Sequence, residues 1–311
     1  MSEHLKGRVA VVTGGGRGIG RELCIALAAE GAKVVVNDLG GAADGTGASN
    51  EPADEVVRAI KSAGGEAVTC FETVATMDGG ERIIKSAVDS FGRLDILVHV
   101  AGILRDRMLF NMTEAEWDAV IAVHLKGMFT TAKHAAILFR QQRSGRIIGF
   151  SSTSGIYGNA GQANYGAAKD GITGFVRGAA RDLGKYGVTV NSIAPAAATR
   201  LTATVTQDAR DARQRAGIRE NAGGGGGLPP PSLDPGDVVP MVVYLCTDAA
   251  KDINGQVFFV QGGLVSLLNN PYASRTMQKT GRWTVEEIAQ VFPGTLGKDV
   301  VNPAPAQQPR S

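Results

Sequence analysis

The chain has 311 residues, of which 43% are hydrophobic and 20% charged, and its 32 Lys and Arg nearly balance its 30 Asp and Glu. This composition describes a globular protein and leaves too little net charge to hold nucleic acid or an anionic membrane surface. The longest apolar run, residues 238–246, contains a proline and is far shorter than the ~20 residues of a membrane helix. No membrane span is therefore expected.

Short apolar runs rich in β-branched residues alternate with longer amphipathic stretches, which is the pattern of repeated βαβ units around a parallel sheet. The runs predict seven strands, Arg8–Thr13, Lys33–Asp38, Glu66–Cys70, Leu94–Val100, Arg146–Phe150, Val188–Ile193 and Val257–Val260. The stretches predict six helices, Ile19–Glu30, Pro52–Ala63, Gly79–Phe91, Thr113–Gln142, Gly161–Tyr186 and Gly236–Thr247. Several runs are apolar on both faces, as in a sheet covered by helices on both sides. The sequence therefore predicts a doubly wound, seven-stranded parallel α/β sheet in a single domain.

This domain is expected to span residues 1–263. The segment Asn221–Gly236 reads NAGGGGGLPPPSLDPG, which can form neither helix nor strand. It is either a disordered linker or, because it falls beside the carboxyl ends of the strands, part of a mobile substrate lid at about residues 200–236. Residues 264–311 are expected to form an extension with one short helix, Thr284–Val291, and a disordered end.

A glycine-rich segment, Thr13–Gly20, joins the first predicted strand to the first predicted helix. Glycines at such a junction let backbone N–H groups approach a pyrophosphate, and the helix N-terminus adds the positive end of its dipole. The alternative is a tight structural turn. The position directly after the first strand favours nucleotide binding. The candidate cofactor-binding residues here are Gly14, Arg17, Gly18, Ile19 and Gly20.

Asp38 ends the second predicted strand, about twenty residues after these glycines. An acidic side chain at this place accepts hydrogen bonds from the adenosine ribose and repels a 2′-phosphate. The sequence therefore predicts NAD as the cofactor. Arg17 could instead contact a 2′-phosphate, which would favour NADP.

Tyr165 and Lys169 stand four residues apart in a strong helix pattern, so both project from one face of the helix. An ammonium close to a phenol favours the phenolate, and such a tyrosine can act as general base on an alcohol or general acid on a ketone. Ser152 ends the preceding strand and could hold the substrate oxygen next to the tyrosine. Taken alone, a Tyr-x-x-x-Lys pair is usually only a solvated helix face.

Together these motifs resemble those of the short-chain dehydrogenase/reductase family: TGGGRGIG at 13–20, Ser152 thirteen residues before Tyr165, and the segment Asn191–Pro195. The resemblance covers roughly residues 5–265. It implies a Rossmann-type fold and an NAD-dependent enzyme in which Ser152 polarises the reacting oxygen and Tyr165 transfers the proton. Lys169 would lower the pKa of the tyrosine and bind the nicotinamide ribose.

The resemblance also implies further cofactor contacts, and the chain departs from the family pattern at several of them. Many members have Asn-Asn-Ala-Gly after the fourth strand, where residues 99–102 read His-Val-Ala-Gly. Many place an acidic residue after the third strand where Thr73 stands, so contact with adenine would fall to the backbone of Val74. His124 replaces the helix asparagine that anchors a water to the lysine, and is either a catalytic residue or a packed core histidine. The additional cofactor-binding residues implied are Val74, Ala101, Gly102, Pro195 and Thr199, together with Tyr165 and Lys169.

A narrower resemblance is to the (3R)-hydroxyacyl-CoA dehydrogenase portion of the peroxisomal multifunctional enzymes of type 2, which is related to 17β-hydroxysteroid dehydrogenase type 4. It rests on VVVNDLGG, AGILRDRM, VHLKG and SGIYGNAGQANYGAAK, and WTVEEIAQVF extends it to about residue 292. It implies oxidation of a 3-hydroxyacyl-CoA of 3R configuration, with a fatty acyl or steroid side chain, to the 3-ketoacyl-CoA. The alternatives are a hydroxysteroid dehydrogenase acting on a ring hydroxyl and, in another class, a nucleotide-binding module without turnover.

Small residues recur on one face of the predicted helix that carries Tyr165, at Ala167, Gly171, Gly174 and Gly178. Glycine inside a helix costs up to ~1 kcal/mol relative to alanine, so the close approach of another element is expected to offset it. The family resemblance suggests the equivalent helix of a second subunit. A homodimer or homotetramer is therefore predicted.

Three cysteines, Cys24, Cys70 and Cys246, are widely spaced and odd in number, so neither a disulfide framework nor a metal site is expected. The N-terminus has no separate apolar signal region, and the chain does not end in Ser-Lys-Leu. We therefore expect a cytoplasmic location.

Arg105 and Arg107 flank Asp106, either as substrate contacts or as a structural ion pair.

Overall fold

The computed structural model describes residues 3–198 and 232–303. These residues belong to two units: the first holds the described residues up to Leu268, and the second holds those from Asn269 onward. Most of the predicted lid, Thr199 and the last eight residues lie outside the described residues. Within the described ranges, no helix is both long and apolar enough to cross a membrane.

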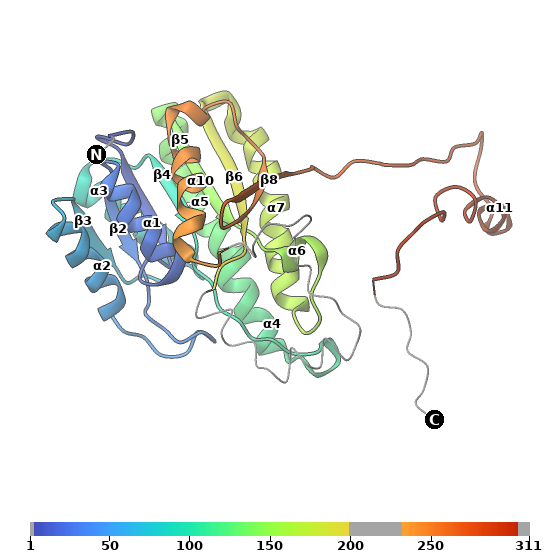
Figure 1. Ribbon diagram of the computed structural model, residues 1–311, viewed down its shortest axis with the longest axis horizontal. Helices are drawn as coiled ribbons and strands as arrows, with labels where there is room; N and C mark the ends of the chain where they lie inside the picture. Colours follow the sequence, from blue (N-terminus) through green and yellow to red (C-terminus); the bar gives the residue numbers. More distant parts are fainter. Residues whose placement is uncertain (1–2, 199–231, 304–311) are drawn as a thin grey trace. The chain divides into compact units, whose positions relative to one another are not determined.

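The first unit is built on one sheet of eight strands in the order β3-β2-β1-β4-β5-β6-β7-β8 (Figure 1). All neighbouring pairs are parallel except β7 and β8, which are antiparallel. The strand order reverses between β1 and β4, and ligands bind beside the carboxyl ends of strands at such a switch point. The strands are β1 (Val9–Thr13), β2 (Lys33–Asn37), β3 (Ala67–Cys70), β4 (Ile96–His99), β5 (Gly145–Phe150), β6 (Val188–Pro195), β7 (Val257–Gln261) and β8 (Leu264–Leu268).

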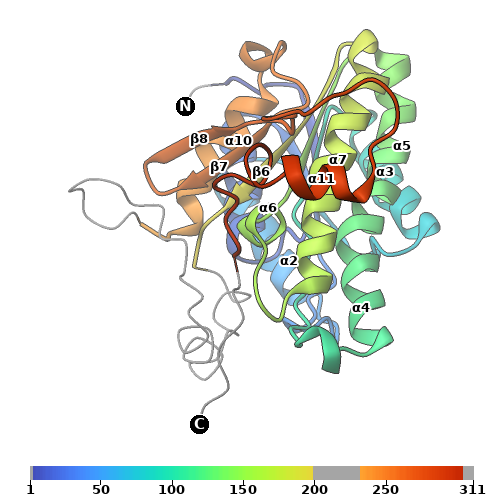
Figure 2. The same cartoon turned by 90° about the vertical axis from the view of Figure 1, so that its right-hand side faces the viewer.

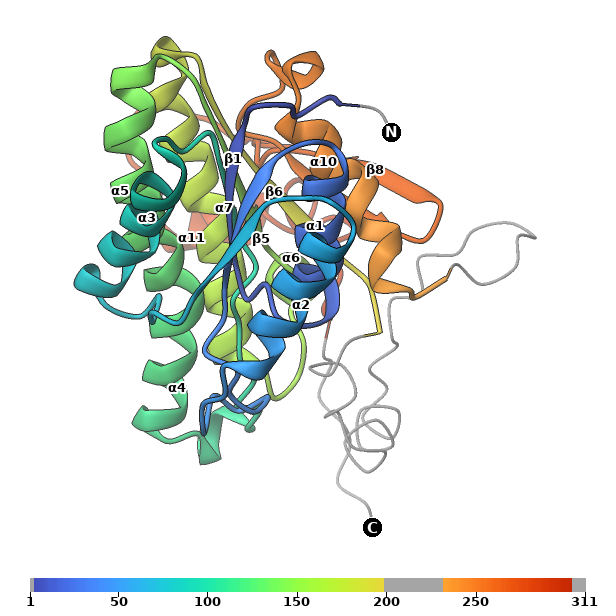
Figure 3. The same cartoon turned by 90° about the vertical axis from the view of Figure 1, so that its left-hand side faces the viewer.

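Helices cover both faces of the sheet, which confirms the predicted doubly wound α/β architecture (Figure 3). On one face lie α1 (Gly18–Ala29), α2 (Glu51–Ser62) and α10 (Val239–Cys246). On the other lie α3 (Met77–Phe91), α5 (Gly127–Gln142) and α7 (Ala163–Leu183). Each set packs against one face of the strands and buries its own apolar core, with Leu23 on the first side and Phe139 on the second. This double burial explains why the strands read as continuous apolar runs.

One predicted helix is divided in the structure, and one short helix is added. The stretch predicted as Thr113–Gln142 forms α4 (Glu114–Ile121), a π-helical turn at Ala122–Lys126, and α5. A short α6 (Thr153–Tyr157) precedes α7, and the sequence reading did not predict it. The π-turn and α6 both lie at the carboxyl side of the sheet, and π-turns within helices are frequent at functional sites.

The predicted count of seven strands is wrong by one, because the sheet continues past Gly263. The residues Gly262 and Gly263 turn the chain back on itself, and Gly262 takes the left-handed backbone conformation (φ 53°) that such a turn favours. Strand β8 then pairs with β7 from Gln261–Leu264 to Val257–Leu268 and forms the outer edge of the sheet (Figure 2).

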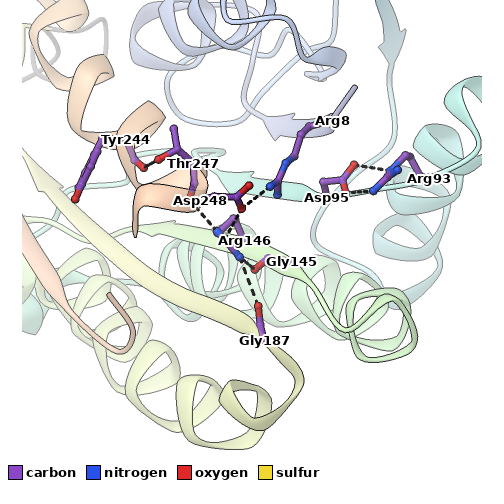
Figure 4. A network of polar contacts seen from close by, with 9 residues as sticks. All are labelled: Arg8, Arg93, Asp95, Gly145, Arg146, Gly187, Tyr244, Thr247 and Asp248. Carbon is purple, nitrogen blue, oxygen red and sulfur yellow. Dashed lines mark hydrogen bonds and ion pairs between the residues drawn. The ribbon is translucent and has the colours of Figure 1, made fainter. Parts of the chain in front are cut away.

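The amino-terminal edge of the sheet is tied together by charged side chains (Figure 4). Arg146 of β5 is almost completely buried and donates to the carboxylate of Asp248 (3.2 Å) and to the carbonyl oxygen of Thr247 (3.3 Å). Arg8 donates to the same Asp248 carboxylate (2.5 Å). These bonds join the starts of β1 and β5 to the end of α10. The amino-terminal edge is therefore occupied by structural bonds, and the carboxyl edge is the one at which ligands bind in folds of this kind.

The second unit contains α11 (Val285–Val291), which begins directly after Thr284. Thr284 and Glu287 exchange the two hydrogen bonds of a capping box. Lys279 forms an ion pair with Glu287 and lies 5.3 Å from the centre of the Trp283 ring. Among residues 269–303 no side chain is buried, so polar contacts within the segment hold this unit together.

Candidate active site

The glycine-rich segment after β1 is shaped by close backbone contacts. A Cβ at Gly14, whose φ is +66°, would lie 2.8 Å from the backbone of Ala101. A Cβ at Gly20 would lie 2.0 Å from the carbonyl oxygen of Gly14. Helix α1 begins at Gly18 with no side-chain cap and no acidic residue in its first turn. Its first N–H groups therefore meet the requirements for binding a phosphate.

Asp38 lies next to this segment and is fixed by it. One carboxylate oxygen accepts a hydrogen bond from the Gly16 N–H (2.8 Å), and the other accepts one from the Gly40 N–H (2.6 Å). The Arg17 guanidinium turns to the carbonyl oxygen of Gly41 (3.1 Å). A negative charge therefore stands at the end of β2, beside the glycines, with its orientation set by two backbone donors.

The three residues of the predicted catalytic triplet meet at the carboxyl edge of the sheet. Ser152 follows β5 and caps α6, while Tyr165 and Lys169 lie one turn apart on α7. Ser152 forms a side-chain hydrogen bond with Tyr165. The Lys169 Nζ lies 5.5 Å from the centre of the Tyr165 ring and donates to the carbonyl oxygen of Phe150 (2.7 Å). The structure thus brings the hydroxyl, the phenol and the amine together.

Burial is the main cause of the shifted pKa values of Tyr165 and Lys169. The pKa of Tyr165 is raised to about 12 as the net result of three causes: burial raises it most, the hydrogen bond from Ser152 lowers it, and the charge of Asp106 raises it. Burial lowers the pKa of Lys169 to about 7. The predicted net lowering of the tyrosine pKa by Lys169 is therefore not seen in this geometry. The reason is that the amine is itself desolvated and is held against the Phe150 carbonyl.

A chain of hydrogen bonds involving His99 joins β1, β4 and the π-turn. The Oγ1 of Thr13 accepts from the Ala101 N–H (3.2 Å) and lies within hydrogen-bond distance of Nδ1 of His99 (3.1 Å). The Nε2–H of His99 donates to the carbonyl oxygen of His124 (3.2 Å). A neutral His99 fits this pattern, with Nδ1 accepting from the Thr13 hydroxyl while Nε2–H donates. Burial and the charge of Lys169 favour the same state, lowering the pKa of His99 to about 3.

His124 lies in the π-turn, against the tyrosine. Its ring meets the Tyr165 ring edge to face, with centres 5.2 Å apart, and its Nε2 lies 2.8 Å from the carbonyl oxygen of Ile103. Burial lowers the pKa of His124 well below its ordinary range. A Cβ at Gly102 would lie 2.3 Å from the His124 Cε1, so the histidine ring explains this glycine. Within the part of the chain that the structure describes, the buried Nδ1 of His124 has no hydrogen-bond partner.

The comparisons with known proteins agree with this arrangement. A family model described as short chain dehydrogenase matches residues 8–212. The chain belongs to the short-chain dehydrogenase family. A crystal structure of a short chain dehydrogenase from Mycobacterium avium superposes with a TM-score of 0.79 and 42% identity, covering 94% of this chain and 96% of that one. Members named as dehydrogenases or reductases make this protein an oxidoreductase.

Two similar proteins have names more specific than that of the family. The hydroxyacyl-CoA dehydrogenase ChsB1 of Mycobacterium tuberculosis is 42% identical over 293 residues, 91% of this chain and 87% of that protein. The peroxisomal multifunctional enzyme type 2 of Mus musculus is 41% identical over 263 residues. That match covers 84% of this chain and 32% of the mouse protein, so this dehydrogenase spans about a third of the mouse enzyme's length.

Of the remaining predicted cofactor residues of this short-chain dehydrogenase, those that the structure describes lie at the carboxyl edge of the sheet. Val74 is buried after β3, and its carbonyl oxygen accepts from Thr130 (2.6 Å). Ala101 and Gly102 follow β4, and Pro195 ends β6. Thr199 lies outside the described residues.

Sequence reasoning missed three polar residues beside the triplet, Asp106, Gln162 and Asn164, as functional candidates. Gln162 and Asn164 are buried, and both hold the loop after β4 against α7. Neither residue has a periodic or motif signal, because its partners in the loop after β4 and in α4 lie 48 to 59 residues away in the chain. Of the charged residues around Asp106, Arg107 pairs with Glu116 (3.0 Å), and Asp106 itself accepts a hydrogen bond from Gln162.

Proposed function

We propose that this short-chain dehydrogenase oxidises a 3-hydroxyacyl-CoA of 3R configuration to the 3-ketoacyl-CoA, with NAD as hydride acceptor. The observation that carries the proposal is the meeting of Ser152, Tyr165 and Lys169 at the carboxyl edge of the sheet, the edge at which the glycine segment follows β1. The substrate class is supported by the names of the relatives, a hydroxyacyl-CoA dehydrogenase and a peroxisomal multifunctional enzyme type 2. The acyl group would be a fatty acyl chain or a steroid with a CoA-activated side chain.

In the proposed reaction, the Oγ of Ser152 holds the oxygen of the substrate alcohol, and Tyr165 in its phenolate form takes the hydroxyl proton. When bound, the nicotinamide accepts the hydride that leaves the same carbon. Lys169 is placed to favour the phenolate when it carries its charge and to contact the nicotinamide ribose. His124 stacks edge-on against Tyr165, and we include it as a residue that contacts the reacting phenol.

The fit to a dinucleotide rests on the glycine segment and Asp38. The residues that would hold it are Gly14, Arg17, Gly18, Ile19, Gly20, Asp38, Val74, Ala101, Gly102, Pro195 and Thr199, with Tyr165 and Lys169. The Asp38 carboxylate would repel a 2′-phosphate, and the Arg17 guanidinium is already engaged with the Gly41 carbonyl. Both features favour NAD over NADP.

The proposal predicts that NADH forms from NAD and a (3R)-hydroxyacyl-CoA, followed by absorbance. The kcat/KM is expected to be at least about 10-fold higher for the 3R than for the 3S substrate, because the 3S hydroxyl would be misplaced relative to Tyr165. It is expected to be at least about 10-fold higher for NAD than for NADP, because Asp38 would repel the 2′-phosphate of NADP. Free hydroxysteroids serve as the comparison. Faster oxidation of a ring hydroxyl would replace the proposal by the hydroxysteroid activity, and no turnover with any alcohol would point to a nucleotide-binding module.

We also propose that the protein forms a homodimer or homotetramer through the exposed part of α7. The small residues on one face of α7 have two different surroundings. Leu125 fills the space at Gly171, where an added Cβ would lie 2.8 Å from its Cδ2, whereas Gly174 and Gly178 are exposed. A Cβ at Gly178 would meet nothing within 4 Å in the described part of the chain. An exposed helix face without side chains is what the close approach of a second helix needs.

This interface predicts that light scattering gives the mass of two or four chains at micromolar concentration. Gly178→Lys is expected to lower that mass by placing a long charged side chain where the second helix would approach. Ala63→Lys, at an exposed position after α2 on the other face of the sheet, is the matched control and should not change it. A wild-type protein with the mass of one chain would contradict the interface.

We propose a cytoplasmic location because the three cysteines are buried and form no disulfide bond. Cys24, Cys70 and Cys246 are all buried and free of disulfide bonds. Burial raises the pKa of the Cys24 thiol and, to about 12, that of Cys246, which keeps both thiols protonated and unreactive. Unpaired cysteines of this kind suit a reducing compartment.

A further inference from the structure

The loop that follows β4 is bonded residue by residue to the start of α7. The Arg107 N–H donates to the carbonyl oxygen of Gly161 (2.8 Å). The Asp106 carboxylate accepts from the Gln162 side-chain amide (2.8 Å), and the Arg105 carbonyl accepts from the side chain of Asn164 (2.9 Å). Three successive loop residues therefore hold the segment that directly precedes Tyr165.

Gln162 is the centre of this arrangement. It is 5% exposed, and its carbonyl oxygen accepts from the Ser154 hydroxyl (2.9 Å) and the Asn159 amide (3.0 Å). Its amide nitrogen must then face Asp106, because that nitrogen can only donate. The Ser154 N–H in turn donates to the Oγ of Ser152 (3.2 Å). A continuous chain of hydrogen bonds therefore runs from Asp106 through Gln162 and Ser154 to Ser152.

Asp106 also affects the tyrosine by its charge. Among the described residues, the groups that act on the Tyr165 phenol are Lys169 on the same helix, Ser152 after β5, His124 in the π-turn and Asp106 in the loop after β4. Burial and the charge of Lys169 hold His124 neutral. Asp106 raises the pKa of Tyr165 and is the one carboxylate among these groups in the described residues. Its charge therefore opposes formation of the phenolate.

We propose that Asp106 is a positioning residue of the reaction: through Gln162 it fixes Ser152 and Tyr165 relative to each other, and its charge sets the pH range in which the tyrosine exchanges its proton. The inference deepens the proposed function and rests on its assignment of proton transfer to Tyr165. It does not depend on the acyl group or on CoA.

The test separates the charge of Asp106 from its hydrogen bond. Asp106→Asn removes the charge but keeps an oxygen that can accept from Gln162. The acid limb of the kcat/KM profile for alcohol oxidation is expected to move to lower pH by roughly 0.3 to 1 unit, because a carboxylate that raised the tyrosine pKa is gone. Since Asp106 is exposed, the shift should shrink as salt is added.

Two further variants test the hydrogen bond. Gln162→Leu keeps the charge and breaks the chain, so kcat is expected to fall about 10-fold or more with little change in KM and no shift in the pH profile. Asp106→Ala should combine both effects. Asp118→Asn, which removes an exposed charge from α4, is the matched control and should leave the profile unchanged.

Hydrogen exchange supplies a readout that needs no turnover. Asp106→Ala and Gln162→Leu should both speed exchange of the Arg107 and Ser154 amides, whereas Asp106→Asn should not. An Asp106→Asn profile identical to that of the wild type, or unchanged exchange in both Asp106→Ala and Gln162→Leu, would overturn the proposal. If the wild type oxidised no alcohol, the proposed function would fail on its own, and the exchange data would still decide whether Asp106 acts through Gln162.

Discussion

Replacing Lys169 with methionine is expected to make this short-chain dehydrogenase more stable at neutral pH while removing most of its turnover. The side chain is buried, and burial lowers its pKa from the ordinary 10.5 to about 7. At neutral pH the folded protein therefore disfavours a charge that the unfolded chain carries freely, a cost of roughly 4 kcal/mol. Methionine fills a similar volume without charge but leaves the Phe150 carbonyl without its donor. After that loss, the free energy of unfolding should rise by roughly 1 to 3 kcal/mol.

The sign of the pH dependence follows from the direction of this shift. Between about pH 7 and 10.5 the unfolded chain binds more protons than the folded one at this site, so the stability of the wild type rises with pH. The destabilisation is complete below the folded pKa of about 7 and disappears as pH rises through 10.5. The advantage of the methionine variant should therefore be largest near neutrality and should shrink toward about pH 10.

Urea unfolding at about pH 7 and about pH 10, together with alcohol oxidation, measures both halves of this prediction. Lys61→Met, at an exposed position on α2, is the matched control and should change stability by less than ~0.5 kcal/mol. Tyr165→Phe should lose turnover by about 10²- to 10⁴-fold without this pH-dependent gain. A lysine variant that is less stable than the wild type at both pH values would show that the amine is not desolvated as the structure has it.

The sequence predicted the fold well where local patterns decide it. Buried strands such as β1 and β4 are predicted by their apolar runs, and the glycines after β1 predict the turn that follows it. The eighth strand had a usable signal, because two glycines between Gln261 and Leu264 join two apolar runs in the manner of a hairpin. The π-turn at Ala122–Lys126 was not predicted, because it spans only five residues, too few for the changed number of residues per turn to show in the apolar pattern.

The candidate site was predictable as a set of residues but not as an electrostatic environment. Tyr165 and Lys169 could be placed on one helix face from their spacing. Their pKa values could not be obtained that way, because burial by distant parts of the chain determines both. The same holds for Gln162, whose partner Asp106 lies 56 residues away. Contacts of this range depend on how helices and loops meet at the sheet edge, which spacing alone does not determine.

The second large effect is expected from Gly20→Ala in the first turn of α1. Gly20 is buried, and an added Cβ would lie 2.0 Å from the carbonyl oxygen of Gly14 and 2.8 Å from its carbonyl carbon. Backbone atoms cannot rotate away, so α1 and the glycine segment must separate. Such overpacking costs about 1–3 kcal/mol of stability, although alanine by itself favours a helix by up to ~1 kcal/mol.

Separation of α1 from Gly14 should also move the N–H groups that are placed to meet the pyrophosphate. The Kd for NAD, measured by calorimetric titration, is expected to rise by about 10²-fold, which corresponds to ~2.7 kcal/mol of lost binding free energy. Gly263→Ala is the matched control, because a Cβ there meets nothing within 4 Å and its backbone has no left-handed φ. A Gly20→Ala protein with wild-type affinity for NAD would mean that the contact between α1 and Gly14 does not position the phosphate donors, and the cofactor site would have to be sought elsewhere along the sheet edge.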